Sequence, residues 1–160
     1  MSTDHGFNRH GQRFDDYRDV HNVGRGPFFF AFRNYVVKNM KVTDQLKRPY
    51  NVTFSVNSSK NLARRLNFQK QANILRQTFP KEKLDVEQVT LAELTVREQV
   101  KVATESAIFV SVVSGAALAA TFLPSGSSVT LFFNGIDDDF MDHSLRKVFP
   151  CMIDWDFWNN

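Results

Sequence analysis

The sequence predicts an α/β fold in which helices flank a parallel sheet. Three observations lead to this prediction. Segments with the two-residue period of a strand alternate with segments that have the spacing of an amphipathic helix. One strand-like segment is apolar on both faces, as expected of a strand covered by helices on both sides of its sheet. The resulting order, strand, helix, strand, helix, strand, helix, strand, is typical of a parallel sheet wrapped by helices.

The first two elements lie in the amino-terminal third of the chain. In residues 28–40 the apolar side chains recur at helical spacing, which indicates an amphipathic helix whose basic face carries Arg33 and Lys38. Residues 52–57 alternate between apolar and polar side chains, which is the pattern of a strand. Because proline disfavours a helical residue before it, Pro49 is expected to break the chain between these two elements.

A helix is predicted after the first strand. Asn67 can cap its first turn, and Pro80 ends it. Its apolar side chains share one face: Phe68, Ala72, Leu75 and Phe79. Val86 and Val89 then indicate a second, short strand.

The second half of the chain continues the alternation. Residues 95–98, Thr-Val-Arg-Glu, have the form of a capping box, which predicts that a helix begins there. Residues 107–113 are short, β-branched and mostly apolar, as in a central strand. A helix-like stretch then reaches Leu123, and residues 129–133 predict another strand.

Composition limits the classes of protein that fit. The chain has 160 residues, 42% of them apolar, which suits a single globular domain. The formal net charge of +3 arises from 20 basic and 17 acidic residues, so composition does not imply a nucleic-acid partner. Cys151 is the only cysteine, which excludes an internal disulfide and a cysteine-rich zinc framework. No apolar run approaches the length of a membrane span, so the chain as given is expected to be soluble.

Several segments, in order, resemble the conserved motifs of the glycosyltransferase family 61. Residues 109–118, FVSVVSGAAL, and 122–126, FLPSG, are similar to the family signature, in which a strand ends in histidine-glycine-alanine and a short helix closes with phenylalanine-leucine-proline. Upstream, residues 64–67 and 98–100 resemble an arginine-arginine segment and a glutamate-glutamine pair of the family. Residues 154–160 resemble a segment of algal and related protist members. The resemblance covers about residues 52–160.

This resemblance implies a fold and an activity. The fold is a Rossmann-like parallel sheet with flanking helices, as in one lobe of a GT-B glycosyltransferase. Residues 51–160 would form this nucleotide-sugar-binding lobe, truncated, and residues 1–50 a poorly ordered amino-terminal segment with one helix. The implied reaction is inverting transfer of a sugar from a nucleotide-diphosphate donor to a glycan or glycoprotein acceptor, without a metal or other cofactor. A Golgi or other secretory lumen is the implied location of the full-length protein.

The candidate donor-binding residues follow from the same motifs. Ser114, Gly115 and Ala116 lie between a strand and a helix, where free amides favour anions and glycine permits a close backbone approach. Arg64 and Arg65 are candidates for contacts to the diphosphate, because guanidinium donors fit phosphate oxygens. Adjacent side chains on a helix diverge, so we expect one of the two arginines to reach the ligand. Ser114 stands where the family usually has histidine, which puts full activity in question.

Other features support alternatives. Asp137-Asp138-Asp139, or Asp154 with Asp156, offer carboxylates that can hold a hard cation, whereas an acidic loop is usually only solvated. The four histidines lack paired zinc-ligand spacing.

No catalytic base is assigned. In two-lobed transferases of this kind the base is expected from an amino-terminal lobe, for which the residues before the first strand are too few. We therefore expect this chain alone to be inactive. A degenerate, non-catalytic nucleotide-binding module or gene fragment, and an unrelated α/β domain, remain the alternatives.

Overall fold

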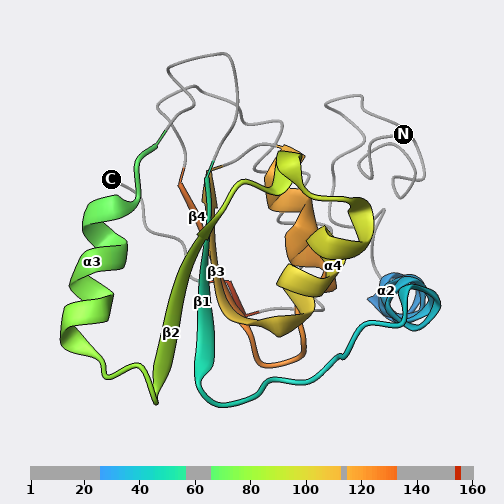
Figure 1. Ribbon diagram of the computed structural model, residues 1–160. Helices are drawn as coiled ribbons and strands as arrows, with labels where there is room; N and C mark the ends of the chain where they lie inside the picture. Colours follow the sequence, from blue (N-terminus) through green and yellow to red (C-terminus); the bar gives the residue numbers. More distant parts are fainter. Residues whose placement is uncertain (1–25, 57–65, 113–114, 133–153, 156–160) are drawn as a thin grey trace.

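The computed structural model describes residues 26–56, 66–112, 115–132 and 154–155 (Figure 1). Helices and strands alternate along most of this chain. The elements, including two 3₁₀ helices labelled η, are α2 (Gly26–Met40), β1 (Tyr50–Ser55), α3 (Gln69–Thr78), β2 (Leu84–Val89), η4 (Leu91–Glu93), α4 (Val96–Glu105), β3 (Ser106–Val112), η5 (Gly115–Phe122), β4 (Ser128–Phe132) and β5 (Asp154–Trp155).

The strands form one parallel sheet, which confirms the predicted α/β fold. Their order is β2-β1-β3-β4-β5, and each neighbouring pair is parallel. β1 therefore lies between β2 and β3 rather than at the edge, although it comes first in the chain. Helix α3 covers one face of the sheet, and α4 covers the other (Figure 1).

Each face of the sheet has its own hydrophobic core. On the α3 side, Val52 and Phe54 of β1 pack with Phe68 and Ala72, and the Phe54 and Phe68 ring centroids are 5.4 Å apart. On the other side, Phe109 of β3 packs with residues of η5. Because side chains alternate across a strand, the residues between the apolar positions of β1 face the α4 side.

The start of α4 agrees with the sequence signal. Thr95 and Glu98 form the predicted capping box: the Glu98 amide donates to Thr95 Oγ1, and the Thr95 amide donates to Glu98 Oε2 at 2.8 Å. The N-cap residue of α3 is Phe68 rather than the expected Asn67, although Asn67 Oδ1 accepts from the Gln69 amide at 2.8 Å. Phe79, expected on the apolar face of that helix, is instead 44% exposed, because α3 ends at Thr78 and the chain turns there.

The residues after β3 form a 3₁₀ helix that packs against the sheet. A 3₁₀ helix has three residues per turn, so side chains three apart lie on the same face. Ala117 and Ala120 of η5 follow this spacing, as does Leu123 just beyond its end, and all three are buried against the core under β3 and β4. Small alanine side chains let the backbone of η5 approach the sheet closely.

The prediction that Arg33 lies with Lys38 on the basic face of this helix is wrong. Lys38 is exposed, but the Arg33 side chain is only 3% exposed. Its Nε donates to the Leu123 carbonyl at 2.9 Å, one terminal nitrogen donates to the Phe122 carbonyl at 3.0 Å, and the guanidinium forms an ion pair with Asp44. A buried charge is tolerated when it is paired and hydrogen-bonded, and these three partners satisfy that requirement.

Arg33 therefore joins α2 to the end of η5. The Phe32 and Phe122 rings pack beside it, with centroids 6.5 Å apart. At the other end of α2, Arg97 of α4 donates to the Met40 carbonyl at 2.9 Å. Helix α2 thus lies outside the layer formed by α4 and η5, on the side away from the sheet (Figure 1).

Candidate functional site

The carboxyl ends of β1 and β3 meet at a point where the chain changes direction across the sheet. From β1 the chain passes through α3 to β2 on one side, and from β3 it passes through η5 to β4 on the other side. The two connections leave adjacent strands toward opposite faces. In parallel α/β sheets, ligands bind outside the carboxyl ends of the strands at such a switch point.

Gly115 begins η5 directly beyond β3, at this edge. The residue is exposed, and a Cβ placed on it would meet no atom of the described part of the chain within 4 Å. Ala116 is half-buried and packs against the core of the α4 side. The start of η5 therefore presents backbone to open space while the following residues anchor the helix to the sheet.

The other predicted donor-binding residues, Arg64, Arg65 and Ser114, lie outside the described residues. Arg64 and Arg65 follow β1 in the chain, and Ser114 directly precedes Gly115. The two segments thus continue from neighbouring strand ends. Contact between an arginine of this pair and a ligand at Gly115 remains a prediction.

Two hydroxyl residues at the switch point were missed by the sequence analysis. Ser55, the last residue of β1, lies opposite Ser111 of β3 in the register of the sheet. Both are 1% exposed. The sequence does show these serines at alternate positions of the strands. In β1 this alternation was used only to predict a strand, and the serine was not considered as a binding residue.

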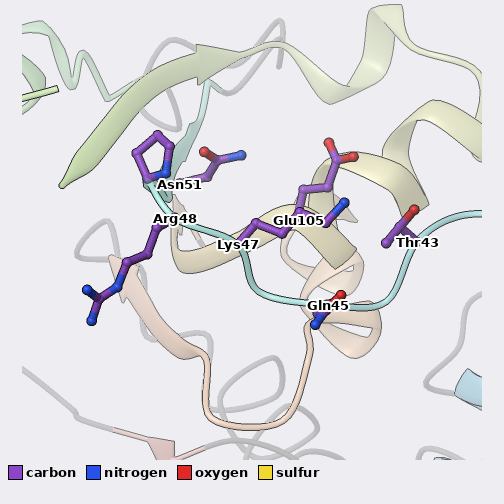
Figure 2. A pocket seen from close by; sticks show the side chains of 7 residues that line it. Thr43, Gln45, Lys47, Arg48, Asn51 and Glu105 are labelled. Atoms are coloured by element: carbon purple, nitrogen blue, oxygen red, sulfur yellow. The ribbon is translucent and has the colours of Figure 1, made fainter. Parts of the chain in front are cut away.

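A pocket lies at the opposite, amino edge of the sheet (Figure 2). It has a volume of about 210 Å³ and is lined by Thr43, Gln45, Lys47, Arg48, Pro49, Asn51 and Glu105. Neither Gly115 nor Ala116, the two predicted donor-binding residues that the structure describes, lines it. The Arg48 guanidinium lies over the Tyr50 ring, 5.5 Å from its centroid, and a hydrogen bond with the Tyr50 side chain raises the pKa of Arg48.

The described part of the chain contains no group of three or more His, Cys, Asp or Glu side chains placed to hold a metal ion. The candidate carboxylates Asp137, Asp138, Asp139 and Asp156 lie outside the described residues, and only the backbone of Asp154 is described. The same described residues include no helix that is both long and apolar enough to span a membrane.

Comparisons with known proteins identify no family for this chain. No protein-family model matches the chain, and no curated protein matches it.

Proposed function

We propose that this chain is a donor-binding lobe of a glycosyltransferase and binds the diphosphate of a nucleotide sugar between the ends of β1 and β3. The proposal combines the motifs that resemble glycosyltransferase family 61 with the topology of the sheet. It assigns donor binding to Gly115 and Ala116, together with Ser114 and one arginine of the 64–65 pair.

The exposed start of η5 is the observation that carries the proposal. The first amides of a helix have no partner within the helix and favour anions. Gly115 itself is exposed, and a Cβ added there would meet no atom of the described residues within 4 Å, so a ligand can approach the backbone at this residue. The start of α4 does not offer the same opportunity, because Thr95 and Glu98 already cap it.

The chemistry that follows from this arrangement is binding and orientation of the donor. The backbone at Gly115 would hold a phosphate oxygen, and a guanidinium would neutralise part of the negative charge of the diphosphate. In this proposal no metal is required, which agrees with the metal-independent chemistry implied by the resemblance. The acceptor is a glycan or glycoprotein, the transfer inverts the anomeric carbon, and the protein works in the Golgi or another secretory lumen.

A charge placed at Gly115 tests the site. Titration calorimetry with UDP, GDP, CDP and ADP, in buffer containing EDTA, would measure affinity for each nucleotide. We expect at least one to bind, and we expect Gly115→Asp to weaken it at least tenfold, because a carboxylate would repel the diphosphate at short range. Ser125→Asp is the matched control, since it adds the same charge at an exposed position before β4, at the other edge of the sheet.

The outcomes separate the alternatives. If none of the four nucleotides binds, the chain is an α/β domain of another function. If Ser125→Asp weakens binding as much as Gly115→Asp, the effect is one of overall charge and the site lies elsewhere. Nucleotide binding without sugar transfer, unchanged by Ser114→His in the full-length protein, would favour a degenerate non-catalytic module.

A further inference from the structure

The buried hydroxyl groups on the α4 side of the sheet have hydrogen-bond partners, with one exception. Thr53 Oγ1 lies 2.7 Å from Ser106 Oγ, which donates to the Val102 carbonyl of α4 at 2.7 Å. Ser111 Oγ donates to the Val112 carbonyl at 3.1 Å, and Ser127 Oγ donates to the Ser106 carbonyl at 3.0 Å.

Ser55 is the exception. Its side chain is 1% exposed, and its Oγ is the only buried side-chain nitrogen or oxygen without a hydrogen-bond partner in the part of the chain that the structure describes. Buried polar groups are nearly always hydrogen-bonded, because leaving one unpaired is unfavourable. The exception therefore calls for an explanation at this position.

The position of Ser55 supplies that explanation. Ser55 is two residues beyond Thr53, whose hydroxyl is linked through Ser106 to α4, so both side chains lie on the α4 side of the sheet. It is also the last residue of β1, and its partner across the sheet, Ser111, is one residue from the end of β3. The unpaired hydroxyl thus lies at the switch point, on the face that η5 also covers.

We propose that Ser55 is a ligand-contacting residue whose hydroxyl donates a hydrogen bond to a phosphate oxygen of the bound nucleotide. This inference rests on the proposed function, because it takes the ligand to be a nucleoside diphosphate. The hydroxyl would add a side-chain donor at the carboxyl end of β1, opposite Ser111 of β3. Because the hydroxyl has no partner among the described residues of the free protein, it can form a hydrogen bond with the ligand without breaking another one.

Ser55→Ala tests this role because it moves two measurements in opposite directions. In the free protein, removal of an unpaired buried hydroxyl should raise the melting temperature by about 3 °C. For the complex, loss of a hydrogen bond to a charged oxygen should weaken binding by about tenfold. A residue with only a structural role would not produce this combination. Ser55→Cys keeps the shape with a weaker donor and should also lower the affinity.

Ser127→Ala is the matched control. It removes an equally buried serine hydroxyl, but one that is paired and lies at the amino edge of the sheet. It should lower the melting temperature and leave the affinity within about twofold of the wild-type value, because the site is distant.

The probes are inorganic pyrophosphate, the four nucleoside diphosphates and the corresponding nucleosides, measured by calorimetry. The wild-type protein should bind pyrophosphate, and the loss in Ser55→Ala should appear with pyrophosphate and diphosphates. A loss seen only with nucleosides would place the hydroxyl on the ribose or base and overturn the assignment to phosphate.

Two results distinguish this inference from the proposed function. If the wild-type protein binds a nucleoside diphosphate and Ser55→Ala binds it equally well, the role of Ser55 is refuted while the donor site stands. If the wild-type protein binds none of the probes, both the proposed function and the role of Ser55 are refuted. Equal losses of affinity in Ser55→Ala and Ser127→Ala would also refute the role.

Discussion

Replacement of Arg33 by methionine tests how strongly α2 is held to the rest of the fold. The substitution keeps much of the buried aliphatic volume and removes the charge and all the donors. It breaks two hydrogen bonds to the carbonyls of Phe122 and Leu123, at 3.0 and 2.9 Å, and the ion pair with Asp44. The carbonyls lose a charged donor that no other described side chain supplies to them.

The magnitude follows from these contacts. Hydrogen bonds that involve a charged group contribute about 1.5–3 kcal/mol each. Asp44 is 36% exposed, so its carboxylate is hydrated again when Arg33 is removed. Loss of the ion pair therefore adds little to the destabilisation. Methionine also restores some apolar contact. We therefore expect Arg33→Met to lower the free energy of unfolding by about 3 kcal/mol, which corresponds to roughly 6–12 °C in melting temperature for a chain of this size.

The assay is urea denaturation, with hydrogen exchange as a local measurement on α2. Lys38→Met is the matched control, because it also replaces a basic side chain by methionine, at an exposed position of the same helix. It should change the free energy of unfolding by less than about 0.5 kcal/mol. Equal effects of the two substitutions, or unchanged exchange protection of α2 in Arg33→Met, would refute the reasoning.

Three further predictions concern the capping box and the core. Thr95→Ala should lower the free energy of unfolding by about 1 kcal/mol in chemical denaturation, and no loss would mean that α4 does not depend on its cap. Hydrogen bonds hold the pKa of Glu98 below its ordinary value of 4.5; the main one comes from the Thr95 side chain, and a second comes from the Thr95 backbone amide. The ionised Glu98 carboxylate therefore stabilises the fold fully above pH 4.5, and this stabilisation is lost as the pH falls through the lower pKa of the folded state. The melting temperatures of the wild-type protein and Glu98→Gln should therefore differ at pH 7 and converge in acid, whereas a constant difference from pH 7 to pH 2 would contradict this origin. Phe109→Ala, at a fully buried position, should cost about 3–5 kcal/mol, while Phe79→Ala, at a side chain that is 44% exposed, should cost less than about 1 kcal/mol; similar losses would argue against the core described here.

Local sequence patterns predicted most of the secondary structure because their causes are local. The capping box at residues 95–98 depends on two side chains three residues apart, and it forms as expected. The strand predicted over residues 52–57 was placed two residues late, since β1 runs from Tyr50 to Ser55. Its first residues pair with β2, a contact that the period of β1 alone does not contain.

The errors and omissions involve partners distant in sequence. The burial of Arg33 depends on Asp44 and on two carbonyls about 90 residues away, which the helical spacing of α2 cannot reveal. The unpaired state of Ser55 likewise appears only when β3 and α4 are placed beside β1. For the candidate site, the sequence placed Gly115 between a strand and a helix, and η5 does begin at Gly115 after β3. The approach of Arg64 or Arg65 to a ligand there remains a prediction.

The central position of β1 has a consequence for synthesis of the chain. As the polypeptide leaves the ribosome, β1 can pair on one side with β2, but its other side waits for β3, which is made after the whole of α4. Until then the growing chain carries an open row of backbone amides and carbonyls next to apolar side chains, which is the surface that promotes association between unfinished chains. The open edge of β1 is therefore covered only once β3 has left the ribosome and paired with it.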